Sequence, residues 1–180
     1  PCRCRAGTVL MAPTELSLAP VLQLYEQRVG IDNTAADMSC LKVPPDDLVE
    51  LCRHLRDDPL LNFDFLSDIC AVDFHPEAPR FLLVYHLFSI RHKWRLRLKC
   101  YLGDPAVAPT VTPVWTTANW HEREAFDMYG IKFDGHPDLR RIYMWDGFDG
   151  YPMRRDFPLR GYKDDYNPMG VDQPVDWGSG

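Results

Sequence analysis

The sequence predicts an α/β (α+β) fold in which helices flank a mixed β-sheet and a long extended arm follows. Its 180 residues are 46% hydrophobic, enough for one domain with a sizeable core. Strand-like alternation occupies the middle of the chain, between segments of helical periodicity. Beyond residue 133 this periodicity ends, and aromatic residues and prolines replace it. We therefore expect an N-terminal extension (1–13), an α/β domain (14–133) and an aromatic and proline-rich arm (134–180).

Two helices are expected before the strands. In residues 14–29, leucines and a valine recur at helical spacing, and Pro20 suggests that the helix begins near it with Ser17 as the cap. A second helix opens at residues 44–47, where two prolines and two aspartates suit a first helical turn. It ends at residues 57–59, and its leucines form one buried stripe.

Four segments are typical of strands. Residues 38–43 form a short one, and residues 63–74 form a longer one with an irregularity around 67–68. Residues 81–90 are apolar at both alternating sets of positions, which predicts a central strand covered on both faces. Residues 94–102 alternate apolar and basic side chains, so this strand has one buried and one polar face.

The polar face of the last strand is basic. Arg95, Arg97 and Lys99 lie on it, and Arg91 and Lys93 precede it in the turn. One interpretation is a solvent face whose charges prevent edge-to-edge pairing. The other is an anion-binding face at residues 91–99 that docks an acidic partner.

Composition excludes several classes of function. Twenty basic against 26 acidic side chains give a net charge of −6, which argues against a nucleic-acid binder. No apolar run approaches 18 residues, so we expect no membrane span. The six cysteines form no C-x-x-C pair and fit neither a zinc ribbon nor an iron–sulfur ligand set. We expect reduced, scattered thiols.

A third helix is expected at residues 118–129, ended by Gly130, and it carries the densest polar cluster. Glu122, Arg123, Glu124 and Asp127 place charge on every face, so some charges must lie in contacts where they need partners. The pattern predicts a self-neutralising network in which Arg123 pairs with Asp127 at i,i+4.

A metal or acid–base site is the alternative for this region. His121, Glu124 and His136 offer ligand types, and a stand-alone metalloenzyme would use them. The H-E-x-x-H motif is absent, because position 125 is alanine. The sequence also contains no G-x-S-x-G, no glycine-rich phosphate loop and no Cys/His nucleophile pattern. We therefore favour the structural network.

Paired arginines characterise the arm. Arg140 and Arg141 follow His136, and Arg154 and Arg155 lie between prolines. Arginine forks of this kind suit bidentate recognition of carboxylates at an interface, and Arg140 and Arg141 would also suit another anion. Interleaved acidic residues, Asp138 and Asp156, offer local partners and weaken any nucleic-acid interpretation.

Aromatic residues are concentrated in residues 143–180, which hold eight of the chain's 22 together with four prolines. A flexible tail would be poor in aromatics, and prolines disfavour long helices and central strands. Such rings need a surface on which to be buried. We expect that surface to be another protein, with the chain's own domain as the alternative.

Two of these segments resemble a known family. Residues 120–131 read W-H-E-R-E-A-F-D-M-Y-G-I, and residues 135–142 read G-H-P-D-L-R-R-I. Together with residues 150–159, they resemble the 30-kDa subunit of respiratory complex I, which in bacteria is the C subunit of the proton-translocating NADH:quinone oxidoreductase. The resemblance covers residues 40–162.

The resemblance implies a non-catalytic core subunit that supports assembly and stability of the peripheral arm of the complex. Its neighbours would be the 49-kDa-type subunit and the cluster-bearing subunits. FMN and iron–sulfur clusters would lie in those partners, and this chain would bind no cofactor. It would lie on the cytoplasmic side of the bacterial inner membrane or the matrix side of the mitochondrial one. Ferredoxin-dependent plastoquinone reductase and membrane-bound hydrogenase contain related subunits, and they remain an alternative.

The resemblance also implies roles for the charged residues. None would be catalytic, cofactor-binding or metal-binding. Ten would form a structural motif or partner interface: Glu122, Arg123, Glu124, Asp127, His136, Arg140, Arg141, Arg154, Arg155 and Asp156.

Overall fold

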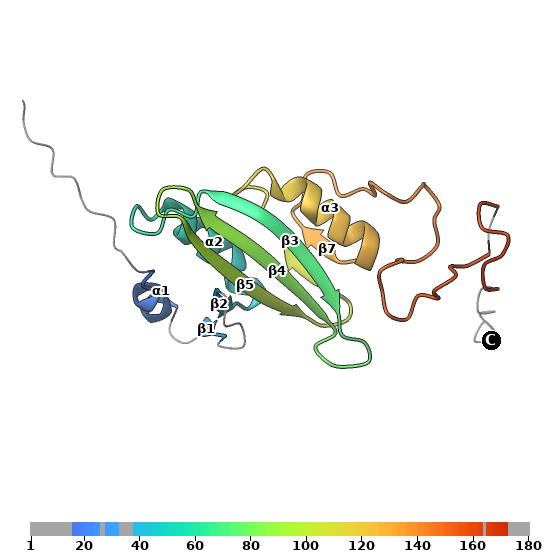
Figure 1. Ribbon diagram of the computed structural model, residues 1–180, viewed down its shortest axis with the longest axis horizontal. Coiled ribbons are helices and arrows are strands. Elements are labelled where there is room, and N and C mark those ends of the chain that lie inside the picture. The colour runs from blue at the N-terminus through green and yellow to red at the C-terminus, as the bar shows by residue number, and fades with distance from the viewer. Residues whose placement is uncertain (1–15, 26–27, 33–37, 164, 173–180) are drawn as a thin grey trace, which may run out of the picture.

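A five-stranded mixed sheet forms the centre of the domain (Figure 1). The computed structural model describes residues 16–25, 28–32, 38–163 and 165–172. The strands lie in the order β1 (Gly30–Ile31), β2 (Ser39–Lys42), β5 (Trp94–Leu102), β4 (Phe81–Ser89) and β3 (Phe65–Asp73). Strands β2 and β5 are parallel and the other neighbours antiparallel. A second sheet pairs β6 (Val107–Pro109) with β7 (Lys132–Asp134). The expected mixed sheet is confirmed.

The register confirms two details of the prediction. Strand β4 lies between β3 and β5, so it is internal to the sheet. The pairing of β3 with β4 shifts between Leu66 and Asp68, where the sequence predicts an irregularity. The extra residue at Ser67 lets Leu66 and Ile69 both face the core.

The prediction that both faces of β4 are covered is wrong for the described part of the chain. Phe81, Leu83 and Tyr85 are fully buried, whereas Val84 and Phe88 on the opposite face are half-buried. Figure 1 shows the two longer helices, α2 (Pro45–Asp57) and α3 (Ala118–Tyr129), on the same side of the sheet. On this second face Leu82 is buried, and Arg95 lies over the Phe88 ring at 5.4 Å, so the face is partly covered.

Helix α2 follows the prediction closely. Proline occupies its first turn, Asp46 and Asp47 lie near its N-terminus, and Leu48, Leu51 and Leu55 are fully buried. These leucines pack with the inner face of the sheet in one hydrophobic core. Within the described residues, no helix is long and apolar enough to cross a membrane.

The first helix is shorter than predicted. Helix α1 covers only Ala19–Leu24, its N-cap is Leu18, and no side chain caps it. Ser17 is therefore not the cap. Proline in the first turn fixes the start, and Val21 is the one residue that the helix buries, so little packing favours a longer helix. The remainder of the predicted 14–29 segment lies partly outside the described residues.

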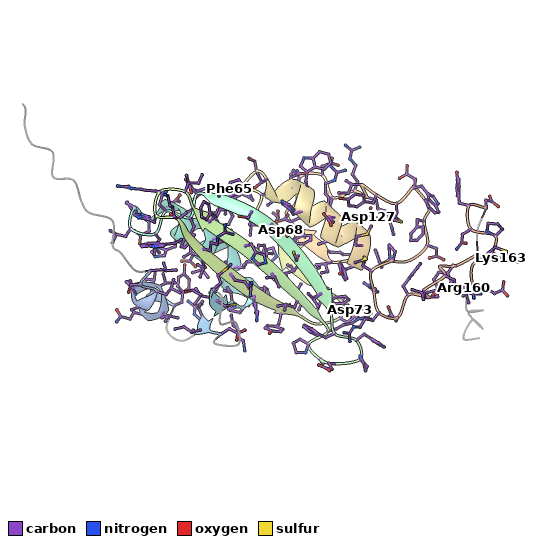
Figure 2. The ribbon with its side chains drawn as sticks, in the orientation of Figure 1. Phe65, Asp68, Asp73, Asp127, Arg160 and Lys163 are labelled. Atoms are coloured by element: carbon purple, nitrogen blue, oxygen red, sulfur yellow. The ribbon has the colours of Figure 1, made fainter. Side chains whose placement is uncertain are left out.

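The arm leaves the domain near the C-terminus of α3. Among the described residues after β7 there are turns and one isolated bridge, between Tyr162 and Val171. Figure 2 shows Phe65 and Asp73 at opposite ends of β3, with Arg160 and Lys163 beyond the Asp73 end. The division of the chain at residue 133 stays a prediction, and many hydrogen bonds cross it.

Candidate functional site

Asp127, in the last turn of α3, is the principal anchor of the arm. Its side chain is fully buried, and one oxygen, Oδ2, accepts hydrogen bonds from the backbone N–H groups of Ile142 (3.0 Å), Tyr143 (2.7 Å) and Met144 (3.0 Å). Arg141 Nη1 donates to Oδ1 at 3.2 Å. Burial would raise the pKa of this carboxyl, but the N–H donors and Arg141 hold it below its ordinary value. The ionised carboxylate therefore binds three successive N–H groups of the arm.

The predicted Arg123–Asp127 ion pair is wrong. Arg123 Nε donates instead to the carbonyl oxygen of Arg140 at 3.1 Å, and its guanidinium lies 4.9 Å from the centroid of the Trp120 ring. The returning arm supplies better partners: N–H groups for Asp127 and carbonyl oxygens for Arg123. Periodicity within one helix cannot show that a distant segment will do this.

A second anchor lies at the end of β3. Asp73 is buried and accepts from Arg80 Nε (3.0 Å) and Nη2 (3.1 Å) and from the backbone N–H of Arg155 (3.0 Å). Arg80 also binds Asp156 at 2.8 Å and Asp104 at 3.0 Å. Burial opposes ionisation of Asp73, but the bonds from Arg80 and Arg155 prevail and lower its pKa to about 2. No sequence motif singles out Asp73 and Arg80 as an ion pair, because they lie outside the charged clusters.

Tyr151 packs between the two anchors, against the C-terminus of α3. Its ring centroid lies 4.5 Å from the guanidinium of Arg154 and 5.2 Å from that of Arg141. Arg154 Nε donates to the carbonyl of Tyr129 at 2.6 Å, which satisfies an open group at the helix end. Gly130 adopts φ +74°, and a Cβ there would lie 2.5 Å from the Tyr151 ring. Glycine is required at this position on both counts.

The four paired arginines of the arm thus have partners within this chain. Besides Arg141 and Arg154, Arg140 Nε donates to Asp138 at 2.9 Å, and Arg155 Nη1 donates to the carbonyl oxygen of His75 at 3.4 Å. Recognition of another protein's carboxylates by these forks stays a prediction. The nearest carboxylates and carbonyls belong to the chain's own α3, β3 and arm.

The aromatic rings farther along the arm contact one another. We define the aromatic cluster as Trp145, Phe148, Phe157, Tyr162 and Tyr166. Successive ring centroids lie 4.9 to 5.9 Å apart, in tilted and edge-to-face arrangements. Trp145 remains 41% exposed and Tyr166 78% exposed. Burial of these rings on another protein stays a prediction.

Glu122 forms a separate buried site on α3. It accepts from the Thr110 hydroxyl at 2.5 Å and from the Val111 backbone N–H at 2.8 Å, and its Oε2 lies 3.8 Å from His136 Nε2. Burial raises the pKa of Glu122 to about 7, although the two hydrogen bonds partly oppose this. Because folding raises this pKa, the protonated acid stabilises the fold below the ordinary value of 4.5. That contribution is lost as the pH rises through 7.

His136 is a neutral neighbour of Glu122. Its Nδ1 accepts from the backbone N–H of Asp138 at 3.0 Å, which assigns the proton to Nε2. The ring side chain is fully buried, and this burial lowers its pKa. His136 Nε2 donates to the carbonyl oxygen of Asn119 at 3.4 Å, so His136 is an uncharged neighbour of the buried acid and not its hydrogen-bond partner.

The residues of the metal alternative do not come together. His121 Nδ1 lies 3.3 Å from Asp68 on β3, His136 faces Glu122, and Glu124 is exposed. Across the part of the chain that the structure describes, no group of three or more His, Cys, Asp or Glu side chains is close enough to hold a metal ion.

Two cations on the basic face of β5 have partners within this chain. Lys99 Nζ pairs with Asp32 at 2.7 Å, and Arg95 lies over the Phe88 ring at 5.4 Å. Docking of an acidic partner on this face stays a prediction.

The fold and the anchors define a class of protein: an α+β domain that uses buried carboxylates to hold an aromatic arm in place. The family described as "Respiratory-chain NADH dehydrogenase, 30 Kd subunit" matches residues 41–163. The chain belongs to this family, and the resemblance of residues 120–142 is confirmed.

Similar proteins agree with the assignment. The NADH-quinone oxidoreductase C 2 subunit of Rhizobium etli (strain CIAT 652) is 57% identical over 88% of this chain and 85% of its own length. The protein of the same name from Rhizobium meliloti (strain 1021) is 67% identical over 73% of this chain and 72% of its own length.

Two solved structures share the fold. A trypsin-resistant fragment of Nqo5 is 31% identical, with a TM-score of 0.59, and the match covers 68% of this chain and 98% of that one. A chain of the membrane-bound sulfane sulfur reductase, an archaeal respiratory membrane complex, is 26% identical, with a TM-score of 0.65. The match covers 78% of this chain and 85% of that one.

Proposed function

We propose that this chain is a non-catalytic core subunit of the peripheral arm of a proton-translocating NADH:quinone oxidoreductase. It would support assembly and stability of the arm that carries electrons. Its family membership and the names of relatives at 57% and 67% identity support the complex. The observation that carries the structural role is the aromatic cluster, of which Trp145 and Tyr166 are exposed, together with the buried anchors that position the arm.

Prior organisation of the arm favours binding. Asp127 and Asp73 fix the backbone at residues 142–144 and at Arg155, on either side of Trp145 and Phe148 and two residues before Phe157. A partner that binds the rings therefore need not order this backbone from a flexible chain, a cost of about 1–2 kcal/mol per residue. Exposed aromatic side chains are the type enriched at the energetic centres of protein interfaces.

The partners follow from the family. The 49-kDa-type subunit and the cluster-bearing subunits are the proposed neighbours of the arm. Those partners would carry the iron–sulfur clusters and FMN, and this chain would contribute no redox group. The proposed location is the cytoplasmic side of the bacterial inner membrane, or the matrix side in a mitochondrion.

Charged substitutions on the outer surface of the arm test the proposal. Truncation after Phe133 would also remove His136 and Arg141, which the domain itself binds, so point substitutions are cleaner. Leu159 is fully exposed and Tyr166 is 78% exposed, so Leu159→Asp and Tyr166→Asp should leave the isolated fold intact. Ile90→Asp is the matched control, because Ile90 is 59% exposed in the turn after β4, at the other end of the sheet from Asp73.

The measurement is the recovery of other subunits with affinity-tagged chain from solubilised membranes, together with NADH:quinone activity. Loss of both in the arm variants, but not in Ile90→Asp, is the expected result. Full assembly and activity in the double arm variant would defeat the proposal.

A related respiratory complex is the second candidate, favoured by the similarity to the sulfane sulfur reductase chain. Co-purification decides between them. An NADH-oxidising flavoprotein among the partners supports the first candidate, and a complex that lacks NADH oxidation supports the second.

A further inference from the structure

A groove opens between α3 and the edge strand β3, outside the anchors and the aromatic cluster. Its volume is about 320 Å³. The walls are mainly apolar and come from three segments of the chain: Ala71 of β3, Ala125 and Met128 of α3, and Met153 of the arm. This volume is at the small end of the range for small-molecule sites, about 300–1,000 Å³, so the groove suits a side chain better than a cofactor.

The rim of the groove is acidic. Asp68 of β3 and Glu124 of α3 both line it, and its lining includes no lysine or arginine. His121 lies 3.3 Å from Asp68, whereas Glu124 is exposed and has no ion pair among the described residues. The pKa of Cys70, also in the lining, is raised to about 11 by burial, by its hydrogen bond to Asp68 and by the nearby charge of Glu124.

We propose that this groove receives an arginine or lysine side chain from a neighbouring subunit. The aliphatic stem would pack on Ala71, Met128 and Met153, and the cationic head would lie at the rim by Glu124. Long basic side chains combine an apolar stem with a charged end, which is the combination of surfaces that this groove presents. An acidic or neutral occupant would leave the rim charge without a counter-ion.

The groove depends on the docked arm. The backbone N–H of Met153 donates to the carbonyl of Met128 at 3.1 Å, so the arm closes one end of the groove against α3. A partner that binds the arm would therefore have the groove beside it. The inference deepens the proposed function and rests on it, because the basic side chain belongs to a subunit of the same complex.

Charge reversal at the rim is the first test, made in the assembled complex. Glu124→Lys places a cation where the partner's cation would lie, and α3 tolerates lysine at an exposed position. Glu77→Lys is the control: Glu77 is exposed in the β3–β4 turn and is not part of the groove lining. We expect Glu124→Lys to reduce recovery of other subunits with the tagged chain about tenfold, and Glu77→Lys to leave it unchanged. Equal recovery with both variants overturns the inference.

A photo-cross-linking side chain at Met153 identifies the occupant. Met153 is 55% exposed, so a benzophenone-bearing residue there should be tolerated. The expected cross-link joins it to a peptide of another subunit that carries a lysine or arginine at or beside the linked residue. A cross-link to this chain itself, or to a peptide without a basic residue, overturns the inference. If no subunit is recovered even with the unaltered chain, the proposed function fails as well.

Discussion

Replacing Asp127 with asparagine should release the start of the arm from α3. All three backbone N–H groups donate to the same carboxylate oxygen, Oδ2, and Arg141 donates to the other. Asparagine keeps one acceptor but loses the charge, and its NH₂ group would face a donor. Hydrogen bonds to charged groups contribute about 1.5–3 kcal/mol, against about 0.5–1.5 for neutral ones. Because several of these hydrogen bonds weaken together, the free energy that holds the arm docked on α3 should fall by about 2–3 kcal/mol.

Native-state hydrogen exchange measures this loss directly. Ile142, Tyr143 and Met144 donate the bonds, so their amides exchange only when the arm opens. A loss of 2–3 kcal/mol corresponds to exchange about 30- to 150-fold faster in Asp127→Asn. Amides of β4 should keep their rates, because the sheet does not depend on this carboxylate.

Asp138→Asn is the matched control. Asp138 is half-exposed and its carboxylate binds Arg140 at 2.9 Å, so the three amides should exchange at the original rate. The reasoning is refuted if Asp127→Asn changes the three amides by less than about twofold. It is also refuted if β4 amides accelerate equally, since that would indicate global unfolding.

Three further substitutions test other parts of the structure. The unfolding free energy of the unaltered protein should fall by about 2–3 kcal/mol between pH 5 and pH 8, because folding raises the pKa of Glu122 to about 7. Glu122→Gln should not show this fall. Parallel pH profiles of the two proteins in urea unfolding would contradict this. Arg80→Met should lower the unfolding free energy by about 2 kcal/mol at pH 7, because it removes the cation that pairs with Asp73. With its pKa lowered to about 2, Asp73 stabilises the fold at pH values above its ordinary pKa, and this stabilisation is lost as the pH falls. The difference in unfolding free energy between the unaltered protein and Arg80→Met should therefore shrink from pH 4 to pH 2. A constant difference in acid unfolding would argue against the anchor. Gly130→Ala should lower the unfolding free energy by about 2 kcal/mol or more, because alanine disfavours the positive φ and its Cβ would clash with the Tyr151 ring. An unchanged melting temperature would rule this out.

The sequence predicts the elements well where the reason is local. Prolines and aspartates at the start of α2, the alternation in β5 and the glycine after α3 each encode their structure within a few residues. The family resemblance likewise depends on contiguous residues, and it is confirmed. Helix α1 is the local failure, because a leucine-rich window suggested more packing than Val21 alone provides.

The sequence could not predict the pairing of charges, because the partners are distant along the chain. Asp73 and Arg155 are 82 residues apart, and Arg80 and Asp156 are 76 apart. For Arg123, helical spacing indicated a nearby aspartate, yet its partner is a carbonyl 17 residues away. Because Arg123 lies at helical spacing from Asp127, no local signal indicated that this buried carboxylate takes its donors from residues 141–144.

The buried anchors and the exposed groove should respond differently to salt, which separates folding of the arm from binding of a partner. Asp127 and Asp73 are buried beside their donors, so ionic screening affects them little. Glu124 is exposed at the rim, so its attraction to a partner's cation should weaken as the ionic strength rises. In the proposed complex the aromatic cluster would bind its partner through apolar area, so salt alone should not release it. In the proposed complex the arm would thus provide a docking surface whose shape is set within this chain, and the groove would add a charge-dependent contact beside it.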